Sequence, residues 1–295
     1  MSRPTPYVFC RYTIHVDDDL LDATATLQAL NEVQGQFLPH GHKAASKGIN
    51  SIVVMQPRRI EIDEQEIVTW KIGHRPGHRT ITDYDATGQQ ISYQVENDRH
   101  IIYTDIVAVP SLGVMAVNDR VSTMHMGAKP ALSRTRSALR QVPGGAFAYW
   151  FLQPGDVDAI LQDMALEEYS YTIRRINPTP PSVLAAALDE TMAQEGIGIQ
   201  RGVAKPMPGE TMQSGNGFIA ASSDFVDAGY GVFGFKGTTG GGHEAQIRKP
   251  AFSLDKKENL KQQQRETPLR VFIESNGNED DHLASIVSEL VRFYA

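Results

Sequence analysis

The sequence predicts an α+β protein in two parts: an N-terminal strand-rich antiparallel sheet with two helices, and a C-terminal α+β layer with two helices on one sheet. Three observations lead to this. Short alternating segments separated by turn residues fill positions 51–118, a strand–proline–helix unit runs from Glu167 to Glu195, and the chain ends in a helix-like apolar pattern. We place the domain boundary after residue 164, so the domains are 1–164 and 165–295.

Composition limits the possible classes of function. Of 295 residues, 41% are hydrophobic and 21% are charged, which is typical of a folded protein. We see no run of about 18 apolar residues and no secretory pattern, so we expect no membrane contact. The single cysteine, Cys10, lies on an apolar strand face where a buried, inert thiol is expected. One cysteine allows no internal disulfide, so a reducing cytoplasm is the expected location. The net charge of −7 requires any nucleic-acid binding to use a local basic patch.

Strands dominate the N-terminal part. Alternation of apolar and polar residues predicts a strand from Tyr7 to Val16, and the aspartates after it predict a helix from about Asp19 to Val33 that ends at Gly35. Several short segments follow between 51 and 118, joined by turn residues such as Asp63-Glu64-Gln65. Their connections are too short for parallel crossovers, so they predict an antiparallel meander.

A second helix and an aromatic strand complete this part. The segment from Ala128 to Val142 has apolar residues at helical spacing and ends before Pro143-Gly144-Gly145, which predicts a helix. The segment from Ala146 to Leu152 is rich in aromatic residues and predicts a buried strand. A short helix capped by Gly155-Asp156 is expected to reach about Met164.

The strand–proline–helix unit organises the C-terminal part. Residues Tyr169 to Ile173 alternate with the period of a half-buried strand, and Pro181 suits the first turn of the helix that follows. The stretch from Gly196 to Gly217 is rich in glycine and proline, so we expect it to be irregular. Phe218 to Asp227 is weakly strand-like.

A glycine-rich stretch, GYGVFGFKGTTGGGH, lies between two further predicted strands. A phosphate-binding P-loop needs a Gly-Lys-Ser/Thr unit that leads into a helix, whereas here Lys236 precedes a glycine and a strand-like segment follows. The stretch therefore predicts a hairpin turn. Leu269 to Glu274 predicts a last strand, and Asn278 to Asp281 caps the final helix.

Metal chemistry has little support in the sequence. The close histidine pairs are His40/His42 and His74/His78. They lack a third ligand at defined spacing, so we expect no metal site, no cofactor and no catalytic residue. Asp83 and Asp85 share a strand face and are the best pair for a metal-dependent nuclease, because such enzymes gather carboxylates around Mg²⁺. Exposed strand carboxylates are the simpler interpretation.

Two basic groups are the candidate phosphate contacts. Arg75 and Arg79 lie in the segment GHRPGHR, an expected loop that can bring guanidinium groups to phosphate oxygens. Lys129, Arg136 and Arg140 follow one another at i, i+7 and i+11, which places them on one face of the second helix. These five residues are the predicted nucleic-acid contacts, each of which adds to a salt-dependent affinity.

The C-terminal part resembles the RexA phage-exclusion proteins and their uncharacterised bacterial relatives. The resemblance rests on EEYSYTIRRINPTPPSVLAAALDE, on the run YGVFGFKG, on the return strand GGGHEAQIRKPAF and on the final β–α ending, and it covers the order of elements over 165–295. It implies a non-enzymatic, DNA-binding sensor or regulator of anti-phage defence that forms a dimer. It identifies no site residue, because there is no shared motif on which a residue could be aligned.

Three functions stay open. We favour a cytoplasmic, non-enzymatic nucleic-acid-binding component of bacterial or prophage defence, with DNA ahead of RNA as ligand, self-association into a homodimer, and a protein partner from the same operon. One alternative is the metal-dependent nuclease. The other is a protein–protein assembly subunit of a defence complex, with Tyr149-Trp150-Phe151 and the methionines Met207 and Met212 as contacts.

Overall fold

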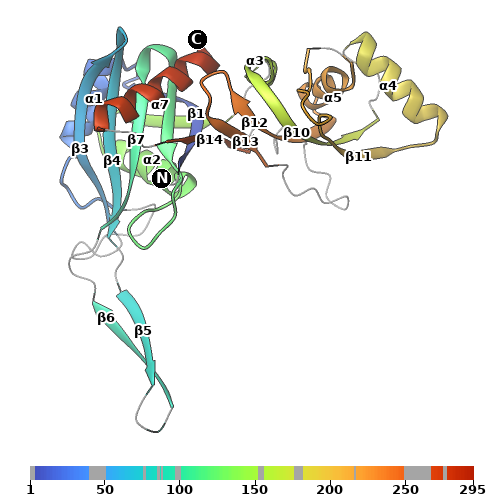
Figure 1. The fold of residues 1–295 in the computed structure, drawn as a ribbon. Helices are drawn as coiled ribbons and strands as arrows, with labels where there is room; N and C mark the ends of the chain where they lie inside the picture. Colours follow the sequence, from blue (N-terminus) through green and yellow to red (C-terminus); the bar gives the residue numbers. More distant parts are fainter. Residues whose placement is uncertain are drawn as a thin grey trace. The chain divides into compact units, whose positions relative to one another are not determined.

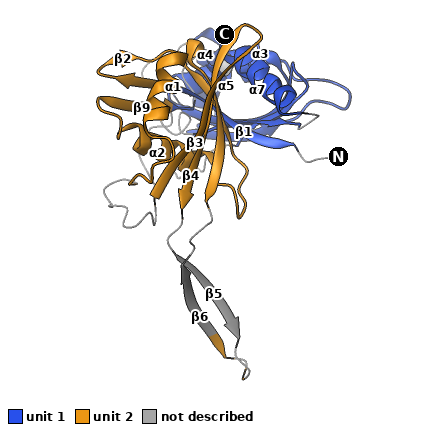
Figure 2. Ribbon diagram, turned by 90° about the vertical axis from the view of Figure 1, so that its left-hand side faces the viewer, with its two compact units in different colours: residues 1–11, 150–295 blue, residues 12–149 orange. Residues whose placement is uncertain are grey.

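The fold has two compact units. The computed structural model describes residues 4–39, 51–75, 78–84, 87, 89–96, 101–151, 156–175, 182–215, 217–248, 267–274 and 278–295. Unit 1 comprises Met1–Arg11 and Trp150–Ala295, and unit 2 comprises Tyr12–Tyr149 (Figure 2). Helices and antiparallel strands occur in both units, which confirms the α+β prediction. The division into domains at residue 164 stays a prediction.

Unit 2 is built on an antiparallel sheet. Its strands are β1 (Thr5–Val16, which begins in unit 1), β2 (Asp19–Leu20), β3 (Ser51–Ile62), β4 (Gln65–Arg75), β7 (Ile102–Val109), β8 (Val114–Asn118) and β9 (Gly145–Trp150). The order along the sheet is β1-β8-β7-β4-β3, and β2 and β9 also pair with β1 (Figure 1). The β3–β4, β4–β7 and β7–β8 ladders are antiparallel, which confirms the predicted antiparallel pairing, but β4 pairs with β7, so the strands do not form one continuous meander. β5 (His78–Tyr84) and β6 (Gln90–Glu96) pair with each other in a separate two-stranded sheet.

Aspartates in left-handed turns connect several of these strands. Asp63 and Glu64 join β3 to β4 with φ angles of 48° and 63°, the two-residue hairpin geometry that matches the twist of the strands. Asp17 and Asp18 have φ angles of 50° and 69° and turn the chain so that β2 pairs with β1. The predicted helix start at Asp19 is therefore wrong, because these aspartates tolerate the left-handed conformation and form a hairpin.

Two helices cover the sheet of unit 2. Helix α1 (Ala23–Glu32) begins after Asp22, whose Oδ1 accepts a hydrogen bond from the amide of Ala25 at 2.8 Å. Helix α2 (Ala128–Leu139) begins where the amide of Ala128 donates to Oδ1 of Asp119 at 2.8 Å. α1 packs on β3 and β4, and α2 packs on β3, β4, β7 and β8. A short 3-10 helix, η1 (Pro110–Leu112), joins β7 to β8.

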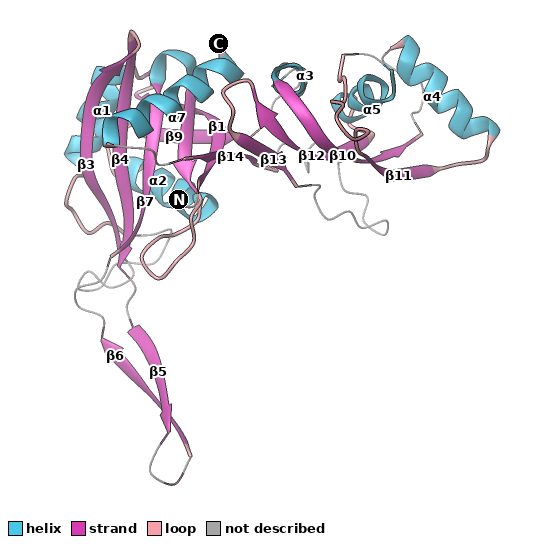
Figure 3. Cartoon of the chain, viewed as in Figure 1, coloured by secondary structure: helices cyan, strands magenta, loops and turns pink. Residues whose placement is uncertain are grey.

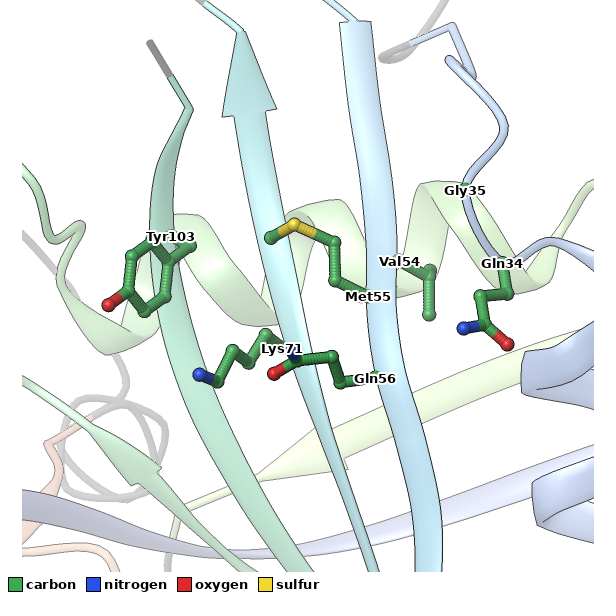
Figure 4. A pocket seen from close by; sticks show the side chains of 7 residues that line it. All are labelled: Gln34, Gly35, Val54, Met55, Gln56, Lys71 and Tyr103. Atoms are coloured by element: carbon green, nitrogen blue, oxygen red, sulfur yellow. The ribbon is translucent and has the colours of Figure 1, made fainter.

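The two faces of this sheet have different surroundings. Thr104 lies opposite Ile72 in the β4–β7 register, and its hydroxyl donates to the carbonyl of Met126, which directly precedes α2. α2 therefore covers the face that carries Ile72. Because successive strand residues alternate, Lys71 and Arg75 project from the other face. Figure 4 shows α2 behind the strands and the side chain of Lys71 in front of them.

Unit 1 combines a sheet with helices, and both kinds of element are coloured in Figure 3. Its strands are β10 (Met164–Arg174), β11 (Ile199–Ala204), β12 (Gly231–Thr239), β13 (Glu244–Ile247) and β14 (Leu269–Ile273), and its helices are α3 (Asp156–Asp163), α4 (Val183–Gln194), α5 (Gly217–Asp227) and α7 (Glu279–Tyr294). The strand order is β11-β10-β12-β13-β14, followed by the first residues of β1. No helix in the described part of the chain is long and apolar enough to cross a membrane.

Two elements of unit 1 differ from expectation. The stretch expected to be irregular contains β11, which pairs with β10 over its whole length. The weakly strand-like stretch forms α5, which buries Ile219, Ser222, Phe225 and Val226. These residues recur at helical spacing, but serine and alanine between them hide the amphipathic pattern. The resulting helix packs on β10 and β12, where the hydroxyl of Tyr169 lies 2.9 Å from Oγ of Ser222.

The glycine-rich stretch forms the predicted hairpin turn, between β12 and β13. A Cβ atom added at Gly241 would overlap Oε1 of Glu289 on α7, so a side chain there requires the Glu289 carboxylate to move. The same carboxylate oxygen lies 3.3 Å from Nε of Arg292, whose Nη1 lies 3.6 Å from Oδ1 of Asp163. The glycines therefore allow the turn to approach an ion-paired cluster on the helix.

A buried cluster joins β1 to α3 and α7. Nη2 of Arg11 lies 2.8 Å from Oδ1 of Asp156, and the guanidinium carbon lies 4.9 Å from the centre of the Tyr294 ring. Cys10 is fully buried beside them, which confirms the expected inert thiol. Burial raises the pKa of the Cys10 thiol and of the Tyr294 phenol well above their ordinary values.

Candidate nucleic-acid interface

Helix α2 carries an uninterrupted row of positive charge. The segment 128–142 holds four cations, Lys129, Arg134, Arg136 and Arg140, and contains no aspartate or glutamate. Lys129 lies in the first turn, Arg136 in the last turn and Arg140 at the C-cap, so the predicted helix and the shared face of these three residues are both present. Along the helix axis the three are separated by about 10 Å and about 6 Å. Lys129 and Arg140 are exposed.

Arg136 is held in place without being neutralised. Its Nε donates to the carbonyl of Phe147 at 3.3 Å, and its guanidinium carbon lies 5.0 Å from the centre of the Tyr149 ring. Both partners are uncharged. Within the described part of the chain, neither Arg136 nor Arg140 forms an ion pair. Their full positive charge therefore remains available to an anion, and the stacking on Tyr149 limits the rotamers that Arg136 must give up on binding.

Four arginines elsewhere in the described residues form ion pairs with carboxylates, whereas Arg174 lies over the ring of Tyr230 much as Arg136 lies over that of Tyr149. The carboxylate-paired arginines are Arg11, Arg59, Arg175 and Arg292, with Asp156, Glu66, Asp189 and Asp163 as their respective partners. An arginine that is already paired gains less from a phosphate, because it must first release its carboxylate. Arg134, on α2 itself, is half-buried and donates to the carbonyl of Pro130 at 3.2 Å, and burial lowers the pKa of its guanidinium.

The other predicted contacts lie elsewhere. Arg75 ends β4 on the sheet face that α2 does not cover, and its guanidinium carbon lies 5.4 Å from the centre of the Phe37 ring. Arg79 is a residue of β5, but its side chain lies outside the described residues. The structure thus brings Lys129, Arg136 and Arg140 together on α2 and separates Arg75 from them.

A recess on the Arg75 face of the sheet is a second candidate site. We call it the sheet-face hollow; it is lined by Gln34, Gly35, Val54, Met55, Gln56, Lys71 and Tyr103 and has a volume of about 430 Å³ (Figure 4). Lys71 Nζ lies 5.2 Å from the centre of the Tyr103 ring and 3.8 Å from Oδ1 of Asp105. The hollow therefore combines an aromatic ring, a thioether, two amides and a cation.

The shape of the hollow depends on two features of β3 and β4. A Cβ atom added at Gly73 would lie 2.5 Å from Cγ2 of Ile101, 2.8 Å from Cε of Met55 and 2.9 Å from Cγ1 of Val53, so a side chain at this position would displace the side chains that lie across β4. The register of β3 against β4 shifts between Met55 and Arg58, and Gln56 within this bulge has a φ of 50°. A non-glycine residue in the left-handed region is strained, and such residues and bulges gather at functional sites.

Sequence reasoning missed the hollow because its residues come from four separate segments. The alternation in β4 places Lys71 on one face, and this signal was readable in the sequence. Its proximity to Tyr103 follows only from the β4–β7 register, in which Lys71 lies opposite Asp105 and Gly73 opposite Tyr103.

The residues that the structure describes add no site for the alternative functions. Asp85 and the side chain of Asp83 lie outside the described residues, and the described residues contain no group of three or more histidine, cysteine, aspartate or glutamate side chains that could hold a metal ion. Of the proposed assembly contacts, Phe151 is buried and Met207 is 65% exposed. Met212 forms an isolated bridge with Leu166.

No protein-family model matches the sequence, and no curated protein matches it significantly.

Proposed function

We propose that the protein is a non-enzymatic nucleic-acid-binding component of a bacterial or prophage anti-phage defence system, and that α2 contacts the phosphate backbone. The observation that carries this proposal is the state of Arg136, which is positioned by a carbonyl and an aromatic ring, carries no carboxylate partner among the described residues, and lies between exposed Lys129 and Arg140. A row of cations on a segment, 128–142, that itself contains no aspartate or glutamate gives a local basic patch on a chain of net charge −7.

The geometry suits phosphates better than base edges. The three side chains are spread along a helix axis over about 16 Å, whereas specific base reading needs several side chains converging in one groove. We therefore expect weak dependence on sequence and strong dependence on salt, with DNA as the preferred ligand. The resemblance of residues 165–295 to RexA proteins supports the defence role, a homodimer and a partner encoded nearby.

Titration of a labelled duplex across salt concentrations tests the proposal. Each phosphate contact contributes about 0.9 to the slope of log K against log salt, so the triple variant Lys129→Ala, Arg136→Leu, Arg140→Ala lowers the slope by about 3. The matched control, Arg59→Ala, Lys205→Ala, Lys236→Ala, removes the same charge from side chains outside α2 and leaves the slope unchanged. Equal slopes for both triple variants, or no duplex binding at low salt, contradict the proposal.

The defence role needs its own measurement. Phage should form fewer plaques on lawns of bacteria that express the parent chain than on lawns that express the α2 triple variant. Lawns that express the control triple variant should behave like those with the parent chain. Light scattering of the purified protein measures its oligomeric state.

A further inference from the structure

We propose that the sheet-face hollow binds an unpaired nucleobase together with its adjoining phosphate. The ligand is either a free nucleotide or one nucleotide of a single strand, because both present the same chemistry. The hollow lies on the sheet face that α2 does not cover, and none of the α2 cations takes part in it. The inference therefore goes beyond the proposed duplex contact, and the two proposals can be tested independently.

The hollow offers a surface on which a base can stack. Its volume of about 430 Å³ is within the range of small-ligand sites, and Tyr103 and Met55 supply an aromatic ring and a polarisable thioether at its wall and floor. Figure 4 shows both side chains on the near face of the strands. Aromatic rings commonly hold unpaired bases, since every base has a flat apolar face. Because Lys71 Nζ lies over the Tyr103 ring, a base that stacks on this face takes the place of the ammonium.

Two amides are placed to meet the edge of such a base. Gln34 follows α1 and Gln56 lies in the bulge of β3, so the two come from separate elements and meet at one recess (Figure 4). Each amide can donate and accept, as the edges of bases require. The left-handed backbone of Gln56, with a φ of 50°, is a strained conformation for a glutamine, and such conformations gather at functional sites.

Lys71 provides a cation for the phosphate. Lys71 Nζ is 3.8 Å from Oδ1 of Asp105, and both side chains are 37% exposed. A long, exposed ion pair of this kind contributes little, so a phosphate can recruit the ammonium at low cost. Arg75 lies four residues along the same strand face, about 13 Å away, and extends the positive surface toward a neighbouring nucleotide of a strand.

Base pairing would prevent this mode of binding. In a duplex both flat faces of each base are covered by their neighbours, so entry into the hollow would require unstacking at a cost of a few kcal/mol. The hollow therefore distinguishes single-stranded from double-stranded ligands, which the α2 contacts do not.

Fluorescence anisotropy tests the inference with three probes: a short labelled single strand of mixed sequence, the same strand annealed to its complement, and adenosine monophosphate as competitor. Tyr103→Leu should weaken single-strand binding about tenfold and leave duplex binding unchanged, whereas Tyr103→Phe keeps the parent affinity. Gln56→Ala, at an exposed position, provides a second variant should Tyr103→Leu fail to fold, and it should weaken single-strand binding alone.

A control variant and the three probes distinguish the possible outcomes. Tyr149→Leu removes the aromatic ring beside Arg136 and must leave competition by adenosine monophosphate unchanged. Competition that is lost in Tyr103→Leu identifies a free nucleotide as a ligand; single-strand binding without competition identifies the strand. Single-strand and nucleotide affinities that are absent, or that Tyr103→Leu and Gln56→Ala both leave intact, overturn the inference. A parent protein that binds the single strand but not the duplex would contradict the α2 proposal and leave this inference intact.

Discussion

The guanidinium of Arg136 lies over the ring of Tyr149, with 5.0 Å between the guanidinium carbon and the ring centre, while Nε of the same residue donates to the carbonyl of Phe147 at 3.3 Å. This arrangement fixes the cation by uncharged groups. It differs from the Arg59–Glu66 pair, in which Nη2 and Oε1 lie 2.6 Å apart and the charges cancel. The difference between a positioned and a neutralised arginine gives the first prediction.

Arg136→Leu should weaken duplex binding and reduce the salt slope by about 1, because one phosphate contact is lost. Tyr149→Ala should keep the charge of Arg136 but remove the ring that positions it. Duplex affinity should fall about two- to fivefold, which corresponds to an exposed cation–π contact of about 0.5–1 kcal/mol. Anisotropy titrations of both variants measure this. Arg59→Leu is the control, and an equal effect in Arg59→Leu would refute the distinction.

Gln56 should show the cost of its backbone conformation. Glycine adopts a φ of 50° without strain, whereas alanine does not, so Gln56→Gly should exceed Gln56→Ala in free energy of unfolding by about 1 kcal/mol. Urea denaturation followed by circular dichroism compares the two variants. Equal stabilities would mean that the bulge relaxes once the glutamine is removed.

Gly241 should tolerate no side chain. An added Cβ atom would overlap Oε1 of buried Glu289, so Gly241→Ala should lower the free energy of unfolding by about 1–3 kcal/mol. Gly198→Ala is the matched control, since a Cβ atom there has no heavy atom within 4 Å, and it should change stability by less than about 0.5 kcal/mol. Thermal unfolding of the two variants gives the comparison. Similar melting temperatures would show that the turn moves away from α7.

Alkaline pH should destabilise unit 1. The pKa of the Cys10 thiol is raised by burial above its ordinary value of 9.0, and that of Tyr294 above 10.0. The folded state therefore keeps protons that the unfolded state loses. The stabilising contribution of the protonated groups is fully present below pH 9.0. As the pH rises above 9.0, the free energy of unfolding decreases by up to about 1.4 kcal/mol per pH unit for each group. Urea denaturation at several pH values measures this, and Cys10→Ala should show a shallower decline that begins near 10.0.

Local patterns predicted much of the fold. The alternation from Tyr169 to Ile173 and the capping residues before the final helix identified β10 and α7, because the signal and the structure share one stretch of chain. α5 escaped because its buried serines read as polar, although Oγ of Ser222 accompanies the Tyr169 hydroxyl inside the protein. The predicted helix start at Asp19 was wrong because aspartate is favoured both at helix N-caps and in left-handed hairpin turns, and here Asp17 and Asp18 form such a turn.

The candidate site was predictable only in part. Spacing along α2 identified Lys129, Arg136 and Arg140, since a helix brings i, i+7 and i+11 together without help from the rest of the chain. What distinguishes Arg136 from Arg59 is the identity of its neighbours across the fold, which spacing does not reveal. Arg75 was correctly seen as basic, but only the sheet register shows that it faces away from α2.

The enclosure of Cys10 within unit 1 makes the chain convenient for spectroscopy. Its sulfur is the only thiol in the sequence and is shielded from solvent, so maleimide reagents have no native target while the protein is folded. A reporter dye can therefore be attached through Val183→Cys on α4, where the native side chain is 87% exposed, without first removing a natural cysteine.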